Sequence, residues 1–311
     1  MAISQVHGNA GSLSRSQQRS RTISMVRMVI GKGFHSLILL FILLWTIVPF
    51  IWLLLTSFQT NLDVVSRPFN LLPEKVYFGN YINLVGSQYG AGKVTTPAQG
   101  YKFALRNSLI ISSCTTLLAL IIGILGGYAF SRINFKGKTP FFYIILTMQM
   151  FPFIAMVIPL YMVVNRLGLR DNMLSLILVD AAFISPYVVW IMRNFFDSIP
   201  RDLEDAALID GAGRMQALYH VILPLTAPGI VAASVYSFLA SWNDFFAGLT
   251  FTATIKSKPV TVLMTEFSTA ASVDIGLSTT GAILAVISPI LLAVIFQRYL
   301  VKGLISGAVK G

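Results

Sequence analysis

Long uninterrupted runs of apolar residues dominate the pattern along this chain. A helix needs about 20 apolar residues to cross the roughly 30 Å hydrocarbon core of a bilayer. Six segments meet this requirement; four carry no charged residue, and the other two carry one aspartate each, Asp180 and Asp244. The six predicted spans are 37–55, 108–130, 140–165, 172–192, 225–249 and 277–296. The pattern therefore predicts an all-α membrane protein with six transmembrane helices.

The composition excludes an ordinary water-soluble enzyme. Of the 311 residues, 55% are hydrophobic and 11% are charged, whereas soluble domains carry about 25% charged residues. The alternative for any single run is a buried helix of a large soluble core. That alternative does not account for six such runs in a chain with so little charge.

The basic residues predict the orientation in the membrane. The net charge of +11 would suggest a nucleic-acid partner in a soluble protein, but in a membrane protein Lys and Arg mark the cytoplasmic side. The segment before the first predicted span, the loop 131–139 and the segment after residue 296 carry bases and no acid. We therefore expect a multi-pass protein of the cell (inner/plasma) membrane with both termini in the cytoplasm, in contact with lipid and not with nucleic acid.

The predicted organisation has three parts: residues 1–33 form a disordered basic tail, 34–303 the six-span domain, and 304–311 a cytoplasmic tail. Within the six-span domain, an outer loop covers 56–106 and a cytoplasmic loop covers 197–224. The first apolar run is too long and begins too late for a cleavable signal peptide, and no small-residue cleavage site follows it.

The motifs of common catalytic and metal sites are missing from the sequence. Gly137-Lys138-Thr139 resembles the end of a phosphate-binding loop, but Arg132 occupies the required earlier glycine position. The one cysteine and the three scattered histidines do not have the spacing of a metal site. We expect no catalytic residue, no metal and no cofactor bound by this chain, so energy for uphill transport has to come from an ion gradient or another subunit.

The loop 197–224 differs from the other cytoplasmic segments because it is mainly acidic. Pro200 suits a helix start, three acids follow in the first turn where they favour the helix dipole, and Gly211 offers a left-handed stop. A second short helix from about Gly213 ends before Pro224. Such a helix–turn–helix either enters a groove on a partner protein or merely connects two spans, and the residues alone leave both options open.

This segment resembles the EAA loop of ATP-binding-cassette importer permeases. The family pattern is E-A-A, three residues, G, nine residues and I-x-L-P; it is matched by Asp205-Ala206-Ala207, Gly211 and Val221-Ile222-Leu223-Pro224. Asp for Glu and Val for Ile are conservative departures. Four further stretches resemble the carbohydrate-uptake branch of the family, and within it the second permease of a maltose-type pair. These stretches are Ile199-Pro200, Ile209-Asp210-Gly211-Ala212, Ser241-Trp242-Asn243-Asp244-Phe245 and Gly307-Ala308-Val309-Lys310-Gly311.

The resemblance implies a set of partners and a coupling role for the loop. Family members work as two permease subunits, here a heterodimer, with two ATPase subunits that use ATP and Mg and an extracytoplasmic solute-binding protein. The EAA helix sits in a cleft of the ATPase, Gly211 shapes the turn, and Asp205 or Glu204 accepts hydrogen bonds or pairs with a base there. The residues implied in coupling to the ATPase are Glu204, Asp205, Ala206, Ala207, Asp210, Gly211, Leu223 and Pro224.

Polar residues inside the predicted spans are candidates for a substrate pathway, because such residues are costly in a membrane. Asn243 and Asp244 beside Trp242 offer the hydrogen-bonding groups and the aromatic face that sugars require, and Asp180 and Gln149 are further candidates. The alternative is that these residues only satisfy partners within the helix bundle.

The sequence thus predicts a non-catalytic permease subunit of an ATP-driven importer that translocates a sugar or oligosaccharide. Within the same family, the solute could instead be a polyol or a glycerol phosphate. A secondary transporter without an ATPase is the rival outside the family, and Asp180 is the residue that keeps this rival open, since ion-coupled carriers place carboxylates at the membrane midplane.

Overall fold

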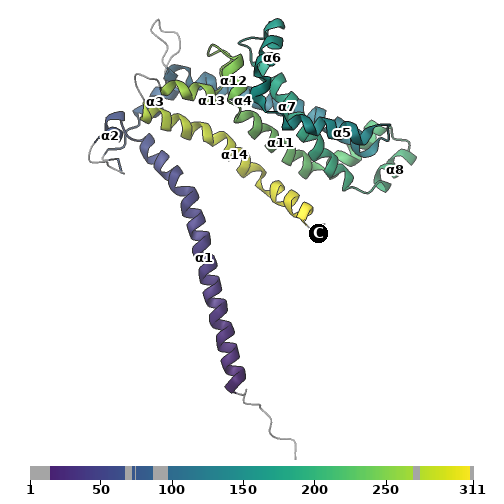
Figure 1. The fold of residues 1–311 in the computed structure, drawn as a ribbon, viewed down its shortest axis with the longest axis horizontal. Coiled ribbons are helices and arrows are strands. Elements are labelled where there is room, and N and C mark those ends of the chain that lie inside the picture. The colour runs from purple at the N-terminus through teal and green to yellow at the C-terminus, as the bar shows by residue number, and fades with distance from the viewer. Residues whose placement is uncertain (1–14, 67–71, 74, 87–96, 269–273, 309–311) are drawn as a thin grey trace, which may run out of the picture. The chain divides into compact units, whose positions relative to one another are not determined.

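The computed structural model describes residues 15–66, 72–73, 75–86, 97–268 and 274–308, with the backbone alone for 15–31 and 299–308. Helices form the regular structure of these residues, and no strand is present among them (Figure 1). The α-helices are α1 Arg15–Ser57, α2 Asn61–Val65, α3 Gly79–Gly86, α4 Pro97–Arg132, α5 Lys138–Thr147, α6 Phe153–Arg166, α7 Met173–Asp197, α8 Asp202–Ile209, α9 Arg214–Ala217, α10 Leu223–Leu225, α11 Ala227–Trp242, α12 Phe246–Phe251, α13 Val260–Leu263 and α14 Ile275–Ala308. Two 3-10 helices, η1 Met148–Met150 and η3 Met264–Phe267, and one π-helical turn, η2 Leu218–Ile222, complete the set. The all-helical prediction is confirmed.

The described residues include four helices that are long and apolar enough to cross a membrane, within α1, α4, α7 and α14. Two further candidates are bent pairs: Lys138–Met150 with Phe153–Arg166, and Arg214–Leu225 with Ala227–Trp242. Counting each bent pair as one span gives up to six. The chain is therefore a multi-pass membrane protein.

The chain divides into two compact units, Met1–Leu54 and Leu55–Gly311. In the first unit, α1 already begins at Arg15, inside the segment predicted to be a disordered tail, whereas residues 1–14 lie outside the described residues. The apolar part of this helix contains Pro49. The sequence placed the tail boundary at the onset of the apolar run, but the helix continues through Gly31 and Gly33 at that boundary.

In the second unit, α4 and α7 form the most extensive helix pair, and α11 packs against both (Figure 1). Small residues on α4 permit this close approach. A Cβ at Gly123 would lie 2.2 Å from a side-chain atom of Val188, and a Cβ at Gly127 would lie 2.9 Å from the backbone nitrogen of Arg193. The two glycines therefore set the spacing between α4 and α7, and the loop 197–224 follows α7.

Two of the predicted spans are broken. The span predicted over 140–165 bends by 97° between η1 and α6, because Pro152 cannot continue the helix and Phe151 before it is extended, with φ −75° and ψ 124°. The span predicted over 225–249 is interrupted between α11 and α12. Each of these two predicted spans thus consists of two helical parts.

The boundaries of the predicted loops also shift. The outer loop predicted over 56–106 contains α2, α3 and the start of α4, while residues 87–96 in its middle lie outside the described residues. At the other end, α14 continues to Ala308 beyond the predicted boundary at residue 303. Residues 309–311 of the predicted C-terminal tail lie outside the described residues.

Candidate functional site

The mainly acidic loop folds as a short helix, a glycine turn and a second helical segment. Helix α8 begins at Asp202 with its acids in the first turn, where negative charge favours the helix dipole. It ends in a left-handed turn: the backbone N–H of Gly211 donates to Leu208 O at 3.1 Å, and that of Ala212 donates to Ala207 O at 3.0 Å. This hydrogen-bond pair is a Schellman cap. Gly211 has a φ of +87°, so the glycine is required by the backbone conformation.

The second helical segment anchors the loop in the membrane domain. Its first turn is capped by Gln216, whose side-chain oxygen accepts from the backbone N–H of Gly213 at 2.8 Å. Leu218 and Ile222 are buried in a cluster that also contains Phe196 of α7. The segment continues through α10 and bends by 81° into α11. Movement of this segment is thereby linked to both α7 and α11.

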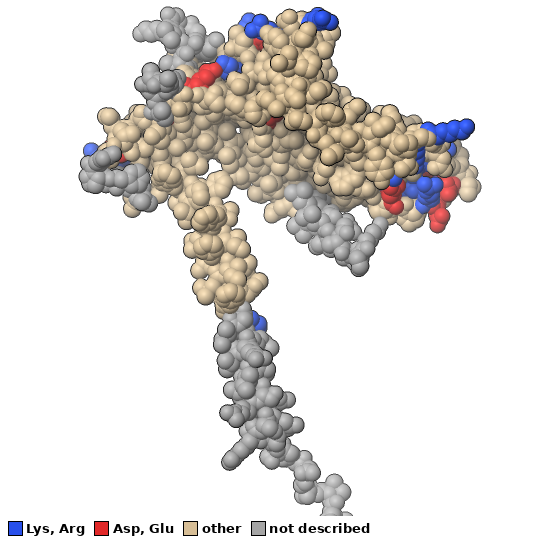
Figure 2. Space-filling model, in the orientation of Figure 1, with Lys and Arg blue, Asp and Glu red and all other residues tan. Residues whose placement is uncertain are grey.

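The opposite surface of the loop is exposed. We call it the docking face: Asp205, Ala206, Asp210 and Gly211 are exposed and Ala207 is half-buried. Large apolar side chains flank it, with Ile209 85% and Tyr219 68% exposed. Figure 2 shows acidic and basic side chains together at the end of the second unit that carries α8. Small residues bordered by exposed apolar and acidic groups suit insertion into a groove of a partner protein. Of the remaining predicted coupling residues, Leu223 is half-buried and Pro224 is exposed.

Glu204 does not belong to this face. Its side chain is only 8% exposed, and its Oε2 lies 3.2 Å from Nε of Arg132, whose side chain is 4% exposed. The Tyr128 hydroxyl donates to Oε1 of Glu204 at 2.5 Å. The sequence treated Glu204 and Asp205 as alternatives for contact with a partner; Asp205 is exposed for this contact, whereas Glu204 is directed into its own chain.

Further polar contacts at this end of the bundle were missed from the sequence. The guanidinium of Arg132 donates to the carbonyl oxygens of Phe196 at 2.9 Å and Ile199 at 2.8 Å. The neighbouring Ser131 hydroxyl donates to Asp197 Oδ1 at 2.6 Å. In the sequence, Arg132 was used only as one of the basic residues that predict the orientation in the membrane. The signal that could have revealed its role is its spacing from Tyr128, because residues four apart share one helix face.

The candidate substrate residues are brought together only in part. Asp180 of α7 is 7% exposed, and its Oδ2 accepts from the Ser241 hydroxyl of α11 at 2.6 Å. Asp244 is near enough to interact electrostatically with Asp180. The Oδ1 of Asp244 also accepts from the backbone N–H of Ala247 at 3.4 Å, at the start of α12. Buried Asp180 and half-buried Asp244 thus lie near each other beside a helix break.

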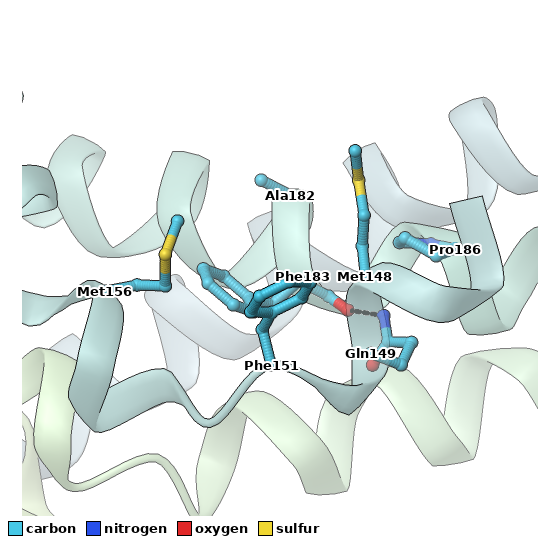
Figure 3. Close-up of a pocket in the computed structure, with 7 residues that line it drawn as sticks. All are labelled: Met148, Gln149, Phe151, Met156, Ala182, Phe183 and Pro186. Atoms are coloured by element: carbon cyan, nitrogen blue, oxygen red, sulfur yellow. Dashed lines mark hydrogen bonds between the residues drawn. The ribbon is translucent and has the colours of Figure 1, made fainter. Parts of the chain in front are cut away.

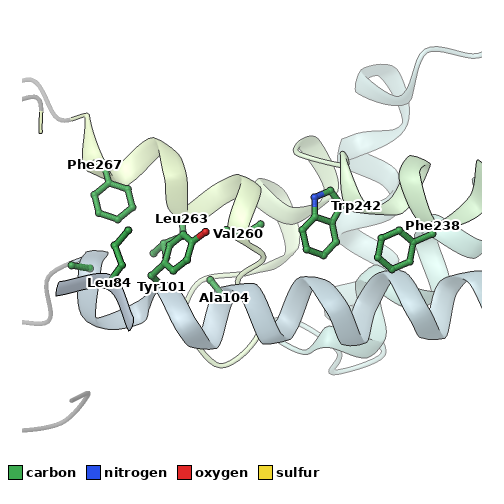
Figure 4. Packing of buried hydrophobic residues seen from close by; sticks show 9 residues of the cluster. Leu84, Tyr101, Ala104, Phe238, Trp242, Val260, Leu263 and Phe267 are labelled. Carbon is green, nitrogen blue, oxygen red and sulfur yellow. The ribbon is translucent and has the colours of Figure 1, made fainter. Parts of the chain in front are cut away.

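Trp242 and Asn243 are occupied by contacts within the protein. Trp242 is 4% exposed and stacks on Phe238, with ring centroids 5.5 Å apart (Figure 4). It belongs to the same cluster as Tyr101 and Leu263. The side-chain amide of Asn243 donates to Leu239 O at 2.8 Å, while its residue is exposed. The indole that the sequence offered as an aromatic face for sugars is therefore part of the core in this structure.

Gln149 lies apart from this cluster, at the bend between η1 and α6. Its amide donates to the carbonyl oxygen of Phe183, in the turn of α7 that precedes Pro186 (Figure 3). Pro186 has no backbone N–H to donate to the carbonyl oxygen of Ala182, the residue before Phe183. Gln149 thus adds a side-chain bond in the turn of α7 that proline weakens. The surrounding cavity of about 320 Å³ is lined mainly by Met and Phe side chains together with Ala182 and Pro186.

On the other side of the membrane domain, Asp171 fastens the loop 252–259. This residue lies between α6 and α7 with a φ of +55°. Its carboxylate accepts from the backbone N–H groups of Ala253 and Thr254, each at 2.9 Å, and from the hydroxyls of Thr254 and Ser257, each at 2.6 Å. Partial burial acts to raise the pKa of Asp171, but these hydrogen bonds outweigh it and hold the pKa far below the usual range. Asp171 therefore stays ionised as a structural clamp.

Asn107, the residue before the second predicted span, binds the same loop. It is fully buried, and its amide donates to the carbonyl oxygens of Ile255 at 2.9 Å and Lys258 at 3.1 Å. The next residue, Ser108, accepts from the backbone N–H of Val260 at 2.8 Å. Within the described residues, no group of three or more His, Cys, Asp or Glu side chains is arranged to hold a metal ion.

The helix–turn–helix of the 197–224 loop lies between two helices that pack together, α7 and α11. Residues 82–306 match the family model described as the inner membrane component of binding-protein-dependent transport systems. The chain belongs to this family.

Alignments with relatives of this inner membrane component cover most of the chain. It is 31% identical over 294 residues to the trehalose/maltose transport system permease protein MalG of Thermococcus litoralis, covering 94% of this chain and 99% of the relative. It is 35% identical over 269 residues to the trehalose transport system permease protein SugB of Mycobacterium tuberculosis, covering 86% of this chain and 93% of that relative. The predicted resemblance to carbohydrate-uptake permeases is confirmed.

A solved structure agrees with the fold of this inner membrane component. A chain in the crystal structure of a bacterial ABC transporter involved in the import of the acidic polysaccharide alginate aligns with a TM-score of 0.68. The identity is 22%, and the alignment covers 94% of this chain and all of that chain. The likeness establishes the arrangement of helices. Proteins of this family are permease subunits, which are generally non-catalytic.

Proposed function

We propose that this chain is the permease subunit of an ATP-binding-cassette importer that carries a sugar or oligosaccharide across the cell membrane. The observation that carries the proposal is the docking face of α8, with small residues next to a turn that requires Gly211 at φ +87°. Such a face fits a cleft in another protein. The sugar is supported by the relatives, whose names refer to trehalose and maltose transport.

The orientation proposed for the chain has both termini and the 197–224 loop in the cytoplasm. The basic residues of the loop 131–139 support it, since Lys136 and Lys138 lie near the same bundle end as α8, with Lys138 donating to Ser131 O at 3.3 Å. The clamp of Asp171 and the loop 252–259 then faces outward, where a solute-binding protein delivers its sugar. Each bent helix pair counts as one of the six spans.

The remaining parts of the importer are separate chains. A second, different permease completes the membrane channel as a heterodimer, and two ATPase subunits bind ATP and Mg. This chain binds neither; its role is to couple a movement of the ATPases to its membrane helices. Asp205, Ala206, Ala207, Asp210 and Gly211 contact the ATPase, and Leu223 and Pro224 end the second helical segment.

The substrate pathway runs past the polar group of Asp180, Ser241 and Asp244. The 2.6 Å bond between Ser241 and Asp180 joins α7 to α11 within the bundle. Asn243 is exposed beside this group, so it is the residue best placed to meet a sugar. Gln149 at the other break supports the bent helix instead.

Purification of the intact complex in mild detergent tests the proposal. We expect an ATPase and a second permease to accompany this chain, and reconstituted vesicles to take up a radiolabelled disaccharide only with ATP, Mg and the solute-binding protein. Uptake that persists without ATP, with the chain purified alone, would identify a secondary transporter and reject the proposal.

A further inference from the structure

The buried charge of Glu204 needs an explanation beyond docking. A carboxylate in a mostly dehydrated site is costly unless it is paired and hydrogen-bonded. Here, each oxygen has a partner on α4: Oε1 accepts from the Tyr128 hydroxyl at 2.5 Å, and Oε2 lies 3.2 Å from Nε of Arg132. The residue is therefore fully engaged within its own chain and has little surface to offer a partner.

Arg132 extends the connection to a third helix. Its Nη2 donates to the carbonyl oxygens of Phe196 and Ile199 at 2.9 and 2.8 Å. Carbonyls at a helix C-terminus have no partners within the helix, and Phe196 is in the last turn of α7. A single guanidinium thus joins the end of α4, the end of α7 and the first turn of α8.

The backbone of α8 would otherwise rest mainly on its own loop. Its principal neighbours are α9 and η2, and the apolar anchors Leu218 and Ile222 belong to the second helical segment. The ion pair of Glu204 reaches from the first helix to α4. The side chain of Arg201, the residue before α8, adds a bond to the carbonyl oxygen of Ser131 in α4 at 3.3 Å. Its exposed neighbours Asp205 and Ala206 lie on the docking face of the same short helix.

We propose that Glu204 is a positioning residue that transmits force, linking the docking face of α8 to α4 and α7 through Tyr128 and Arg132. The inference rests on the proposed function, because it assumes that an ATPase moves α8. A push on the docking face then shifts α4 and α7 together with α8. Without the link, α8 is held less firmly to α4, and ATP hydrolysis continues with less movement of the membrane helices.

The test separates ATP hydrolysis from transport in the reconstituted full complex. Glu204→Gln removes the charge at nearly constant shape, and Tyr128→Phe removes only the hydroxyl. For both we expect the ATPases to remain bound and the sugar transported per ATP hydrolysed to fall at least about fivefold, the lower end of typical coupling between sites. Asp202→Asn, an exposed acid on the same turn of α8, and Tyr143→Phe, an exposed tyrosine of α5, are matched controls that should leave this ratio unchanged.

A double variant distinguishes transmission from mere stabilisation. Replacing a buried ion pair by apolar residues is often neutral for stability, so Glu204→Met with Arg132→Met should retain the thermal stability of the complex. If the link transmits force, the ratio of transport to hydrolysis stays low in this variant. Recovery of the normal ratio would overturn the proposal.

Other outcomes are equally decisive. A normal ratio in Glu204→Gln, or loss of the ATPases from that variant, would also overturn the proposal, the latter by assigning Glu204 to docking. Failure of the function proposed above looks different, because the unmodified chain would then bring no ATPase with it.

Discussion

Glu204 and Asp205 are consecutive residues of α8 with opposite surroundings: Oε2 of Glu204 lies 3.2 Å from Nε of Arg132, whereas Asp205 is exposed. Consecutive helical residues point about 100° apart, since 3.6 residues complete a turn. The two acids therefore serve different contacts. Glu204 belongs to the interior of the subunit and Asp205 to its docking face.

Charge reversal at Asp205 should detach the ATPases without unfolding the chain. Truncating one partner of a desolvated charge pair costs about 2–5 kcal/mol, so Asp205→Arg should weaken association at least about tenfold. The measurement is the amount of ATPase that co-purifies with the chain in mild detergent. Asp63→Asn, in the separate short helix α2, is the control and should retain the ATPases. Full retention in Asp205→Arg would mean that this acid is not at the interface.

Substitution of Gly211 tests the shape of the turn. No atom lies within 4 Å of a Cβ built at this residue, so the penalty in Gly211→Val comes from its φ of +87° and is of order 1–3 kcal/mol. We expect ATP-dependent uptake to be lost while the protein still inserts into the membrane. Gly168→Val is the matched control, because Gly168 also has a positive φ, +67°, and open space around it, but lies between α6 and α7. Equal loss of uptake in both variants would show a general effect of strain.

The sequence was sufficient for the turn at Gly211 and for the broad pattern of spans. A glycine after an acid-rich helical turn, and runs of about 20 apolar residues, are local signals whose physical cause lies in neighbouring residues. The bend at Pro152 also has a local signal in the sequence, since proline weakens any helix that contains it. However, Pro186 and Pro289 lie inside continuous helices, so proline alone does not reveal which helix breaks.

The contacts of the site could not be predicted in the same way, because they join residues far apart in the chain. Tyr128 and Glu204 are separated by 76 positions, and Asp171 and Thr254 by 83. Which of two adjacent acids faces inward depends on how α8 is rotated against α4. That rotation follows from the packing of Leu218 and Ile222, which the pattern of charges does not reveal.

Trp242 provides a test of the substrate pathway. Its ring is 4% exposed and stacks on Phe238, and removal of a buried aromatic side chain typically costs about 3–5 kcal/mol. Trp242→Ala should therefore lower the thermal stability of the purified complex, whereas Trp242→Phe should retain most of it, with an unchanged KM for the sugar. A large rise in KM for Trp242→Phe at unchanged stability would place the indole in contact with the sugar during transport.

The Asp171 clamp leads to a prediction about pH. Because the pKa of Asp171 is lowered in the folded protein, the clamp contributes its full stability above the unfolded value of about 3.9. This contribution is lost only as the pH falls through the still lower folded value. Between about pH 5 and 8, the loop 252–259 of the unmodified protein should therefore hold its position. Asp171→Asn should release the loop even at neutral pH, because an amide nitrogen cannot accept the bonds that one carboxylate oxygen accepts.

The labelling rate of a cysteine at position 255 measures this release. Ile255 is half-buried and Cys114 is exposed, so the probe is Ile255→Cys in a Cys114→Ser background. We expect Asp171→Asn to speed labelling about tenfold, which corresponds to the loss of roughly 1.4 kcal/mol of the free energy that holds the loop closed. With Asp171 in place, the labelling rate, corrected for ionisation of the thiol, should stay constant from pH 5 to 8. The control, Asp63→Asn, removes an acid that caps α2 through Thr60. Slow labelling in Asp171→Asn would show that Asn107 and Ser108 alone can hold the loop.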